Sequence, residues 1–379
     1  MAEQYQLIAD AAGWAACYEA LRRAPRFAVD VEANSLHAYR ERVCLLQFST
    51  EDADFIVDPL AGLDLSPLGG LLADPSVEKI FHSSDYDLAL LKTQYNWTVC
   101  NLFDTMWAGR VLGFKKMGLA AVLEDLLGVC LSKKFQKANW ARRPLPENWL
   151  DYAANDTRYL LPLRDRLAER LEAEGRMEEA LEIFAAGCEV EPIVRPFDVE
   201  SFWTIQGVRA LEPRAQAVFR ALYAWRENEA KRRDVPPFKV INNQSLVLVA
   251  KAAAGGEGPL TRAPGVSDKT LARLGGGLQA AVEKGRKAPL PKPPKRGERR
   301  QTTGKPGFLQ RYDALLEWRK KAAQLRGVES DVILSRRTAK ELAEKCPVTP
   351  EDLEGIASLG PFRRKRYAGD ILKVLKESK

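Results

Sequence analysis

The stretch RFAVDVEAN, residues 26–34, is the part of the chain around which the rest of the sequence can be ordered. Its apolar residues predict a buried β-strand that carries two carboxylates, Asp30 and Glu32. Alternate side chains of a strand share one face, so both carboxylates point the same way. Like charges this close repel each other unless a cation lies between them, which favours a divalent metal site. A D-x-E pattern alone is more often a solvated strand end, so this hypothesis depends on partners elsewhere in the chain.

Strand-like runs follow this stretch directly. Segments 43–49 and 54–57, separated by polar turns, predict an antiparallel meander with residues 27–32. Within it, residues 43–48 are too apolar for any role but that of a core strand. Later strands alternate with helical patterns as far as a non-periodic segment flanked by prolines near residue 195. This order is typical of an α/β domain, which we assign to residues 1–195.

The second half of the chain repeats itself. The segment LYAWR at 222–226 matches LLEWR at 315–319, 93 residues later, and Val240 matches Ile333 at the same offset. A constant offset across helices and loops indicates a duplicated unit. The predicted parts are two small all-α domains at 210–287 and 307–379 and a basic, proline-rich linker at 288–306.

Composition limits the class of protein. The 379 residues suffice for two or three domains. No apolar run reaches about 18 residues, and residues 1–6 lack the basic start and apolar core of a signal peptide. The six cysteines include no C-x-x-C pair, which predicts reduced thiols and no zinc site. We therefore expect a cytoplasmic protein without membrane contact and see no sign of an obligatory protein partner.

The net charge of +7 conceals two halves of opposite sign. Residues 1–199 carry 21 Lys and Arg against 31 Asp and Glu, whereas residues 200–379 carry 37 against 20. The basic excess of the second half is larger than solubility requires. This asymmetry predicts that one part does chemistry and the other binds a polyanion.

Four acidic residues and one tyrosine form the candidate site. Asp87 follows a later predicted strand, near a helix start, and Asp156 lies four residues after Tyr152. Residues four apart stack on one face of a helix, which places a phenol beside a carboxylate. Together with Asp30 and Glu32, these residues predict a two-metal site for phosphodiester hydrolysis.

The hard oxygen ligands of this site select two divalent ions, Mg²⁺ or Mn²⁺. We expect Asp30 to bridge the ions, with Glu32 and Asp156 completing the first. Asp87 supports the second ion. A phenol with a pKa of about 10 is a poor base at neutral pH, so Tyr152 is predicted to orient the attacking water.

Each residue alone also has a structural interpretation. An isolated tyrosine such as Tyr152 is more often part of a core, and an acid such as Asp87 more often a helix cap. Asp85 competes with Asp87 for the metal role. The two histidines, His37 and His82, lie far in sequence from Asp156, which excludes a histidine base there.

The order of these motifs resembles that of the DEDD exonucleases of the tyrosine subclass, and within them the ribonuclease D family. The motifs are D-x-E at 30–32, H-x-x-x-x-D-L at 82–88 and Y-x-x-x-D at 152–156. The blocks NLFDT at 101–105 and WARRPL at 140–145 are similar to further blocks of that family. The tandem helical repeats resemble HRDC domains, which bind nucleic acids.

This resemblance implies an RNase H-like α/β exonuclease domain, with a mixed sheet flanked by helices, followed by two all-α HRDC-like domains. It implies a 3′-to-5′ exoribonuclease that trims the 3′ ends of structured RNAs, tRNA precursors above all, and releases nucleoside 5′-monophosphates. The matching positions make Asp30, Glu32, Asp87 and Asp156 metal-site carboxylates and Tyr152 the phenol that orients water.

A basic, aromatic stretch precedes the third motif. Residues 133–143 hold five basic residues and no acid inside an otherwise acidic domain. Basic side chains can hold phosphates while rings stack on bases. The predicted RNA-binding residues are Lys133, Lys134, Lys137, Trp140, Arg142 and Arg143. The alternative is a solvated loop whose Trp140 is held in the core.

Two other functions remain open at this level. A DNA-directed 3′-to-5′ exonuclease would use the same carboxylates, and nothing in the sequence reads a 2′-hydroxyl. A non-catalytic tandem nucleic-acid-binding protein is disfavoured, because clustered carboxylates kept without a metal would destabilise the fold.

Overall fold

The computed structural model describes residues 5–132, 134–255, 266–294 and 306–378. The predicted RNA-binding residue Lys133 and most of the predicted linker at 288–306 lie outside them. The chain divides into two compact units. Unit 1 comprises Met1–Ala33, Val43–Ile193 and Thr302–Lys379, and unit 2 comprises Asn34–Arg42 and Val194–Gln301.

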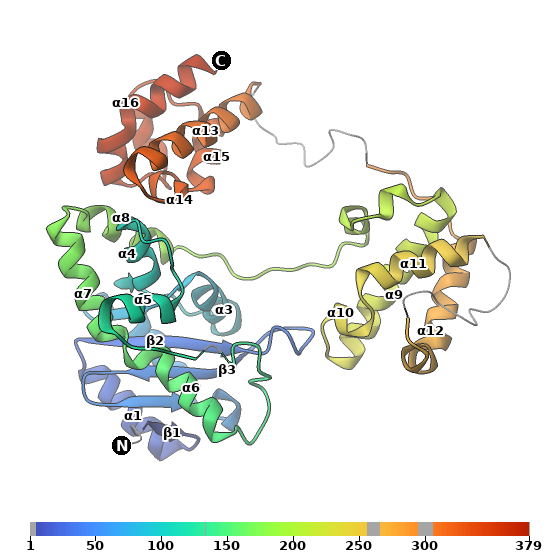
Figure 1. The fold of residues 1–379 in the computed structure, drawn as a ribbon, viewed down its shortest axis with the longest axis horizontal. Coiled ribbons are helices and arrows are strands. Elements are labelled where there is room, and N and C mark those ends of the chain that lie inside the picture. Colours follow the sequence, from blue (N-terminus) through green and yellow to red (C-terminus); the bar gives the residue numbers. More distant parts are fainter. Residues whose placement is uncertain (1–4, 133, 256–265, 295–305, 379) are drawn as a thin grey trace. The chain divides into compact units, whose positions relative to one another are not determined.

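The α/β part of unit 1 is built on a six-stranded mixed sheet (Figure 1). Its strands are β1 (Gln6–Ile8), β2 (Arg26–Ala33), β3 (Val43–Ser49), β4 (Asp54–Val57), β5 (Glu78–Phe81) and β6 (Leu102–Asp104). Their order across the sheet is β1-β4-β3-β2-β5-β6. The antiparallel meander β2-β3-β4 confirms the sequence prediction, and β1, which was not predicted as a strand, pairs in parallel with β4.

Strand β2 owes its central position to its sequence. Phe27, Ala28 and Val29 have no exposed surface and belong to the hydrophobic core, and β3 and β5 pair with the two edges of the strand. The polar residues begin at Asp30, where pairing with β5 has ended and pairing with β3 continues. The carboxylates therefore lie where one edge of the strand opens toward other elements.

Eight helices surround the sheet in the described part of the α/β region. They are α1 (Ala11–Arg23), α2 (Ser66–Leu72), α3 (Asp85–Tyr95), α4 (Thr105–Val111), α5 (Leu119–Leu127), α6 (Glu147–Arg158), α7 (Leu160–Ala173) and α8 (Met177–Gly187). Helix α6 packs across β2, β3 and β4, as Figure 1 shows. This α/β part and the helical parts that follow confirm the predicted fold class.

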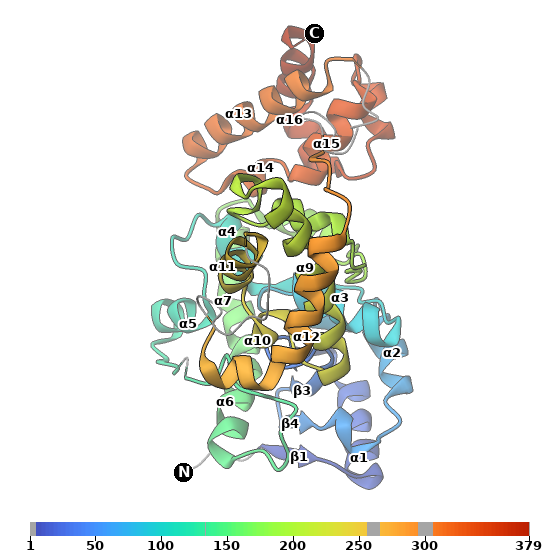
Figure 2. The ribbon, with the colours of Figure 1, turned by 90° about the vertical axis from the view of Figure 1, so that its right-hand side faces the viewer.

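Two helical modules follow. Module 1 contains α9 (Pro213–Arg233), α10 (Pro237–Val240), α11 (Asn243–Ala254) and α12 (Asp268–Lys287), and module 2 contains α13 (Phe308–Arg326), α14 (Ser330–Ile333), α15 (Arg336–Lys345) and α16 (Pro361–Glu377). In module 1, α12 lies along α9 (Figure 2). No helix in the described ranges is long and apolar enough to cross a membrane.

The repeat detected in the sequence has a structural counterpart in two buried arginines. Arg226 donates to the carbonyl of Ile241 at 3.0 Å, and Arg319 donates to the carbonyl of Leu334 at 2.6 Å. Both arginines are 6% exposed. Each closes the end of the short second helix of its module, so the same polar contact organises both copies.

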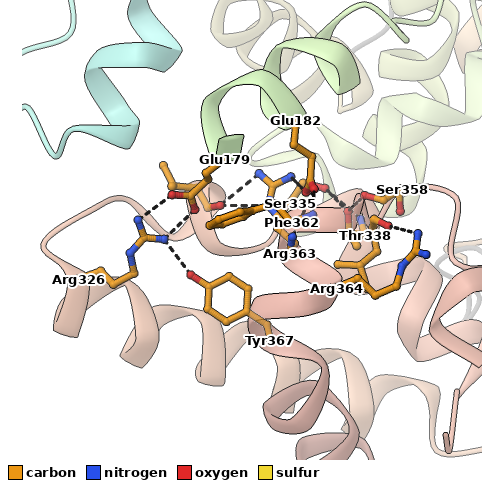
Figure 3. A network of polar contacts seen from close by, with 12 residues as sticks. Glu179, Glu182, Arg326, Ser335, Thr338, Ser358, Phe362, Arg363, Arg364 and Tyr367 are labelled. Atoms are coloured by element: carbon orange, nitrogen blue, oxygen red, sulfur yellow. Dashed lines mark hydrogen bonds and ion pairs between the residues drawn. The ribbon is translucent and has the colours of Figure 1, made fainter. Parts of the chain in front are cut away.

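Module 2 packs against α8 of the α/β part through two buried carboxylates (Figure 3). Glu179 accepts two hydrogen bonds of 2.7 Å from Arg326, which also donates to the Tyr367 hydroxyl at 2.8 Å. Glu182 pairs with Arg363 at 3.1 Å. Buried charges of opposite sign therefore join two parts of the chain that are distant in sequence.

Glu182 also caps the first turn of α16. It accepts a hydrogen bond of 2.6 Å from the backbone N–H of Phe362, one of the donors that a helix start leaves unpaired. Gly360 precedes that turn, and a Cβ atom there would collide with the Glu182 carboxylate. The glycine thus permits the close approach on which the cap depends.

Replacing this carboxylate should uncouple module 2. In Glu182→Ala, Arg363 keeps its buried charge but loses its partner, so we expect destabilisation of about 3–5 kcal/mol. Calorimetry should show a separate, lower transition for module 2. Glu178→Ala, a change in the preceding turn of α8, is the control. A single transition at the wild-type temperature in Glu182→Ala would contradict this account.

Candidate active site

Asp30 and Glu32 lie together on one face of β2. Both are half-buried, and with Asp156 they form a group whose ligand oxygens all lie within 4.8 Å of one another. Asp30 is paired in register with Gln47 on β3, and Glu32 with Leu45. The strand becomes irregular only after Glu32, so regular pairing fixes both carboxylates.

Asp156 and Tyr152 reach this group because α6 lies close to the sheet. Ala153 and Ala154 of α6 are fully buried, and their small side chains allow the helix to approach the sheet closely. The Thr157 hydroxyl lies 2.8 Å from that of Ser49 on β3. Small and hydroxyl side chains in this part of α6 thus orient Tyr152 and Asp156 toward β2.

An ion pair at the end of α6 holds the helix in the same rotation. The Nε atom of Arg158 donates to Asp54 at 2.6 Å, and Asp54 also accepts from the Ser49 hydroxyl at 2.6 Å. Asp54 begins β4, so the helix is tied to two neighbouring strands. This pairing was not predicted, because the partners are 104 residues apart.

Asp87 is placed by a different carboxylate, Asp104. Asp104 is fully buried and accepts hydrogen bonds from the backbone N–H groups of Ser83 and Ser84 at 3.1 and 2.7 Å. It also caps α4 by accepting from Met106 at 2.9 Å. One side chain thereby fixes the turn that leads into α3, where Asp87 is 8% exposed. An Asp before the first residue of a helix was the available signal for this cap.

The electrostatic neighbours distinguish Asp87 from Asp85. Burial first, and then the charges of Asp30, Asp104 and Asp156, raise the pKa of Asp87 well above its ordinary value. Burial and then the charge of Asp104 also raise the pKa of Asp85, and the cation of Arg110 lowers it. Asp87 therefore belongs to the carboxylate group.

The three other carboxylates are perturbed in the same direction. Burial raises the pKa of Asp30 to about 6. It raises the pKa of Glu32 well above normal, with further contributions from Asp30, Asp156 and Asp87. The pKa of Asp156 rises from burial and from the charge of Asp30. Burial is the first cause of all three shifts, and repulsion between clustered carboxylates adds to those of Glu32 and Asp156.

This donor set suits a divalent cation. The ligand atoms of Asp30, Glu32 and Asp156 are hard oxygens at a mutual spacing that one ion can bridge. The charged neighbours that act on Glu32 are all carboxylates, so a cation would relieve a repulsion that burial intensifies. The residues present therefore fit the predicted metal.

Tyr152 faces the same group. Burial and then the charges of Asp156, Glu32 and Asp30 raise its pKa, so the phenol remains protonated at neutral pH. The side chain of Gln136 hydrogen-bonds to it. Sequence reasoning did not single out Gln136, which lies in the basic stretch before α6.

The basic stretch divides into two groups. Trp140 is 1% exposed and packs against Trp149 and Tyr152, with ring centroids 5.5 and 6.1 Å away. Arg143 donates to both oxygens of Asp58 at 2.6 Å and to the Cys44 carbonyl at 2.8 Å. These contacts leave neither side chain oriented toward a ligand, so in place of the predicted RNA contacts we propose structural roles for both.

The remaining predicted RNA-binding residues of the described chain, Lys134, Lys137 and Arg142, are exposed. The ammonium group of Lys134 lies over the ring of Phe135 at 5.4 Å. Phe135 in turn meets the Tyr152 ring edge-on at 6.1 Å. A cavity of about 170 Å³ lies between Phe135, Tyr152 and Asp156. Lys134 is thus connected to the acidic site through an aromatic contact.

His82 has a structural position. Its Nδ1 atom lies 2.9 Å from the Thr105 hydroxyl, and burial lowers its pKa. A neutral imidazole in this environment links β5 to the start of α4.

Comparisons with known proteins agree with this architecture. The family described as 3′-5′ exonuclease matches residues 5–172, and the HRDC domain matches residues 215–282 and 308–375. Ribonuclease D of Gluconacetobacter diazotrophicus is 35% identical over 72% of this chain and 69% of its own length. That of Granulibacter bethesdensis is 32% identical over 75% and 72%.

Solved structures share the fold. Escherichia coli RNase D, described as an exoribonuclease involved in structured RNA processing, has a TM-score of 0.66 at 26% identity, covering 99% of both chains. A protein from Bifidobacterium adolescentis has a TM-score of 0.73 at 21% identity, covering 98% of this chain and all of its own, and shows the same fold.

Divalent cations should stabilise the fold most at high pH. A carboxylate whose pKa is raised by folding costs stability once the pH exceeds its unfolded value, and for Asp30 this cost is complete above about pH 6. Mg²⁺ at 100 times its dissociation constant should add about 2.7 kcal/mol. We expect the rise in Tm on adding Mg²⁺ to be larger at pH 8 than at pH 5.5, where protons compete.

The measurement is thermal unfolding with Mg²⁺ and with EDTA at both values of pH. A variant with Asp30→Asn and Glu32→Gln is the control and should lose the increment. An equal increment at both values of pH would contradict the role of the raised pKa values.

Proposed function

This chain belongs to the ribonuclease D family and is a 3′-to-5′ exoribonuclease of that type, and from this premise we propose its substrate and mechanism. It trims the 3′ ends of structured RNAs, tRNA precursors above all, by hydrolysis that releases nucleoside 5′-monophosphates. The E. coli relative, described as acting in structured RNA processing, supports the substrate class. The observation that carries the mechanism is the convergence of carboxylates from β2, α3 and α6.

Asp30, Glu32 and Asp156 would hold one divalent ion, Mg²⁺ or Mn²⁺, and Asp30 and Asp87 would share a second. When bound, such ions activate water and neutralise charge on the leaving oxygen. The mutual approach of the ligand oxygens, within 4.8 Å for three of the residues, supports this assignment. The β2 pairing and the α6 contacts hold the ligands in place before substrate arrives, which is what efficient catalysis requires.

Tyr152 orients the attacking water by a hydrogen bond. Its raised pKa makes the phenol a donor and an acceptor rather than a base. Gln136 and the ring of Phe135 restrict the phenol from the solvent side. The chain thus supplies orientation to the water, while the carboxylates hold the charge.

RNA reaches the site over Lys134, Lys137 and Arg142. Their exposure, and the contact of Lys134 with Phe135 of the cavity lining, support this path. Lys133 remains part of the proposal although it lies outside the described residues. Phe135 is only partly buried and lines the cavity with Tyr152 and Asp156, so we propose that its ring stacks on a base once Lys134 moves to a phosphate, a contact worth roughly 1–3 kcal/mol.

The proposal is tested with a 3′-extended tRNA and a matched DNA oligonucleotide. Wild-type protein in Mg²⁺ should produce a ladder of one-nucleotide steps on RNA, and EDTA or Asp30→Asn should abolish it. Loss of one ligand that binds both ions should reduce the rate by at least 10³-fold, several kcal/mol of transition-state stabilisation. Internal cleavage products, or faster degradation of DNA than of RNA, would contradict the proposed activity.

Removing two of the exposed cations should change the salt dependence of binding. A Lys134→Ala, Arg142→Ala double variant should bind single-stranded RNA more weakly. The slope of log K against log salt should fall by about 0.7 for each lost phosphate contact. Lys376→Ala, Lys373→Ala in module 2 is a charge-matched control. Fluorescence anisotropy across a salt series measures the affinity and the slope for each variant. An unchanged slope in the Lys134→Ala, Arg142→Ala variant would refute the proposed path of the RNA.

A further inference from the structure

Gln47 occupies the middle of the sheet face that α6 covers. It is paired in register with Asp30 on β2 and with Ile56 on β4. Directly opposed residues of antiparallel strands point to the same face, so its side chain shares the face of the Asp30 carboxylate. Its neighbours on the same face of β3 both meet the α6 layer, Leu45 through the hydrophobic cluster and Ser49 through Thr157.

The side-chain amide of Gln47 is buried and makes no hydrogen bond within the described ranges. The residue has no exposed surface, and neither its Nε2 nor its Oε1 atom has a hydrogen-bond partner in the described ranges. Buried polar side chains are almost always hydrogen-bonded, so such a group requires an explanation. An apolar residue of the same size would fill the space at lower cost, and all other residues of 43–48 are apolar.

The Asp30 carboxylate can accept what Gln47 can donate. Cβ atoms of directly opposed residues lie about 4.5–5.5 Å apart, which brings the tips of an aspartate and a glutamine within hydrogen-bond reach. Asp30 accepts a backbone hydrogen bond from Val31, and its other lone pairs are open to further donors and cations. Carboxylates that hold metals are themselves held by hydrogen bonds from neighbouring groups.

We propose that Gln47 is a positioning residue for the metal site. Its side-chain N–H donates to Asp30 when a cation is bound, and this bond fixes which carboxylate oxygens face the cation. The inference rests on the proposed function, because it requires that Asp30 bind a divalent ion. It adds a residue from β3 to a site otherwise formed by β2, α3 and α6.

The experiment separates positioning from packing. Gln47→Leu keeps the volume of the side chain and removes the donor, and Gln47→Met is a second isostere in case leucine packs poorly. Mn²⁺ binding to the substrate-free protein is followed by electron paramagnetic resonance, and Tm is measured in EDTA. The matched control is Gln216→Leu, the same change at a buried glutamine of module 1 that donates to the Leu211 carbonyl at 2.8 Å.

Gln47→Leu should weaken Mn²⁺ binding by about 10–100-fold and lower kcat by a similar factor, with KM for RNA unchanged. The metal-free protein should keep or raise its Tm, because a buried uncommitted amide is gone. Gln216→Leu should lower Tm and leave Mn²⁺ binding unchanged. Unchanged Mn²⁺ binding in Gln47→Leu would overturn the inference. Weaker Mn²⁺ binding that occurs only together with a lower Tm in EDTA would overturn it too.

A further variant distinguishes failure of this inference from failure of the proposed function. Asp30→Asn removes a ligand and should abolish Mn²⁺ binding. If the wild type and Asp30→Asn bind Mn²⁺ equally, the metal site itself is wrong. If only Asp30→Asn loses binding and Gln47→Leu does not, the metal site stands and the role of Gln47 falls.

Discussion

Four carboxylates from three segments are brought together in a buried site, and the fold must hold them against the cost of burying their charges and, for Glu32, Asp87 and Asp156, against mutual repulsion. For Asp30, burial raises the pKa from 3.8 to about 6, which corresponds to a cost on the order of 3 kcal/mol when the group is ionised. Apolar contacts and an ion pair between α6 and the sheet offset this cost. Ala153 and Ala154 let α6 approach, and the Arg158–Asp54 pair prevents its rotation. Stability is thus traded for a site that attracts divalent cations, as is common at functional centres.

The two helical modules share a duplicated core but differ in surroundings. Arg226 and Arg319 make equivalent buried hydrogen bonds, which shows how strongly the internal packing of the repeat is retained. Module 2 also has two arginines, Arg326 and Arg363, that form ion pairs with glutamates of α8. The start of α16, where Arg363 pairs with Glu182, is therefore partly a docking surface.

Periodicity explains what could be predicted from the sequence. The strand period of two placed Asp30 and Glu32 on one face, and the helical i, i+4 spacing placed Tyr152 beside Asp156. Strand β1 is only three residues long and carries no pattern of its own. The contact of Arg143 with Asp58 could not be predicted, because the two residues lie 85 positions apart in the sequence. Gln47 was passed over inside an apolar run, because only pairing with β2 reveals that it stands opposite Asp30.

The charge division along the chain acquires a second meaning from these contacts. The acidic excess of residues 1–199 includes the clustered carboxylates Asp30, Glu32 and Asp156, and also Glu179 and Glu182, which pair with cations of module 2. Part of the basic excess of the second half is accordingly consumed inside unit 1. A count of lysines and arginines thus overstates the cations that remain for a polyanion. Lysines and arginines that pair with buried carboxylates of the same chain are not available to bind RNA. The exposure of the cations, more than the net charge, therefore decides which surface binds RNA.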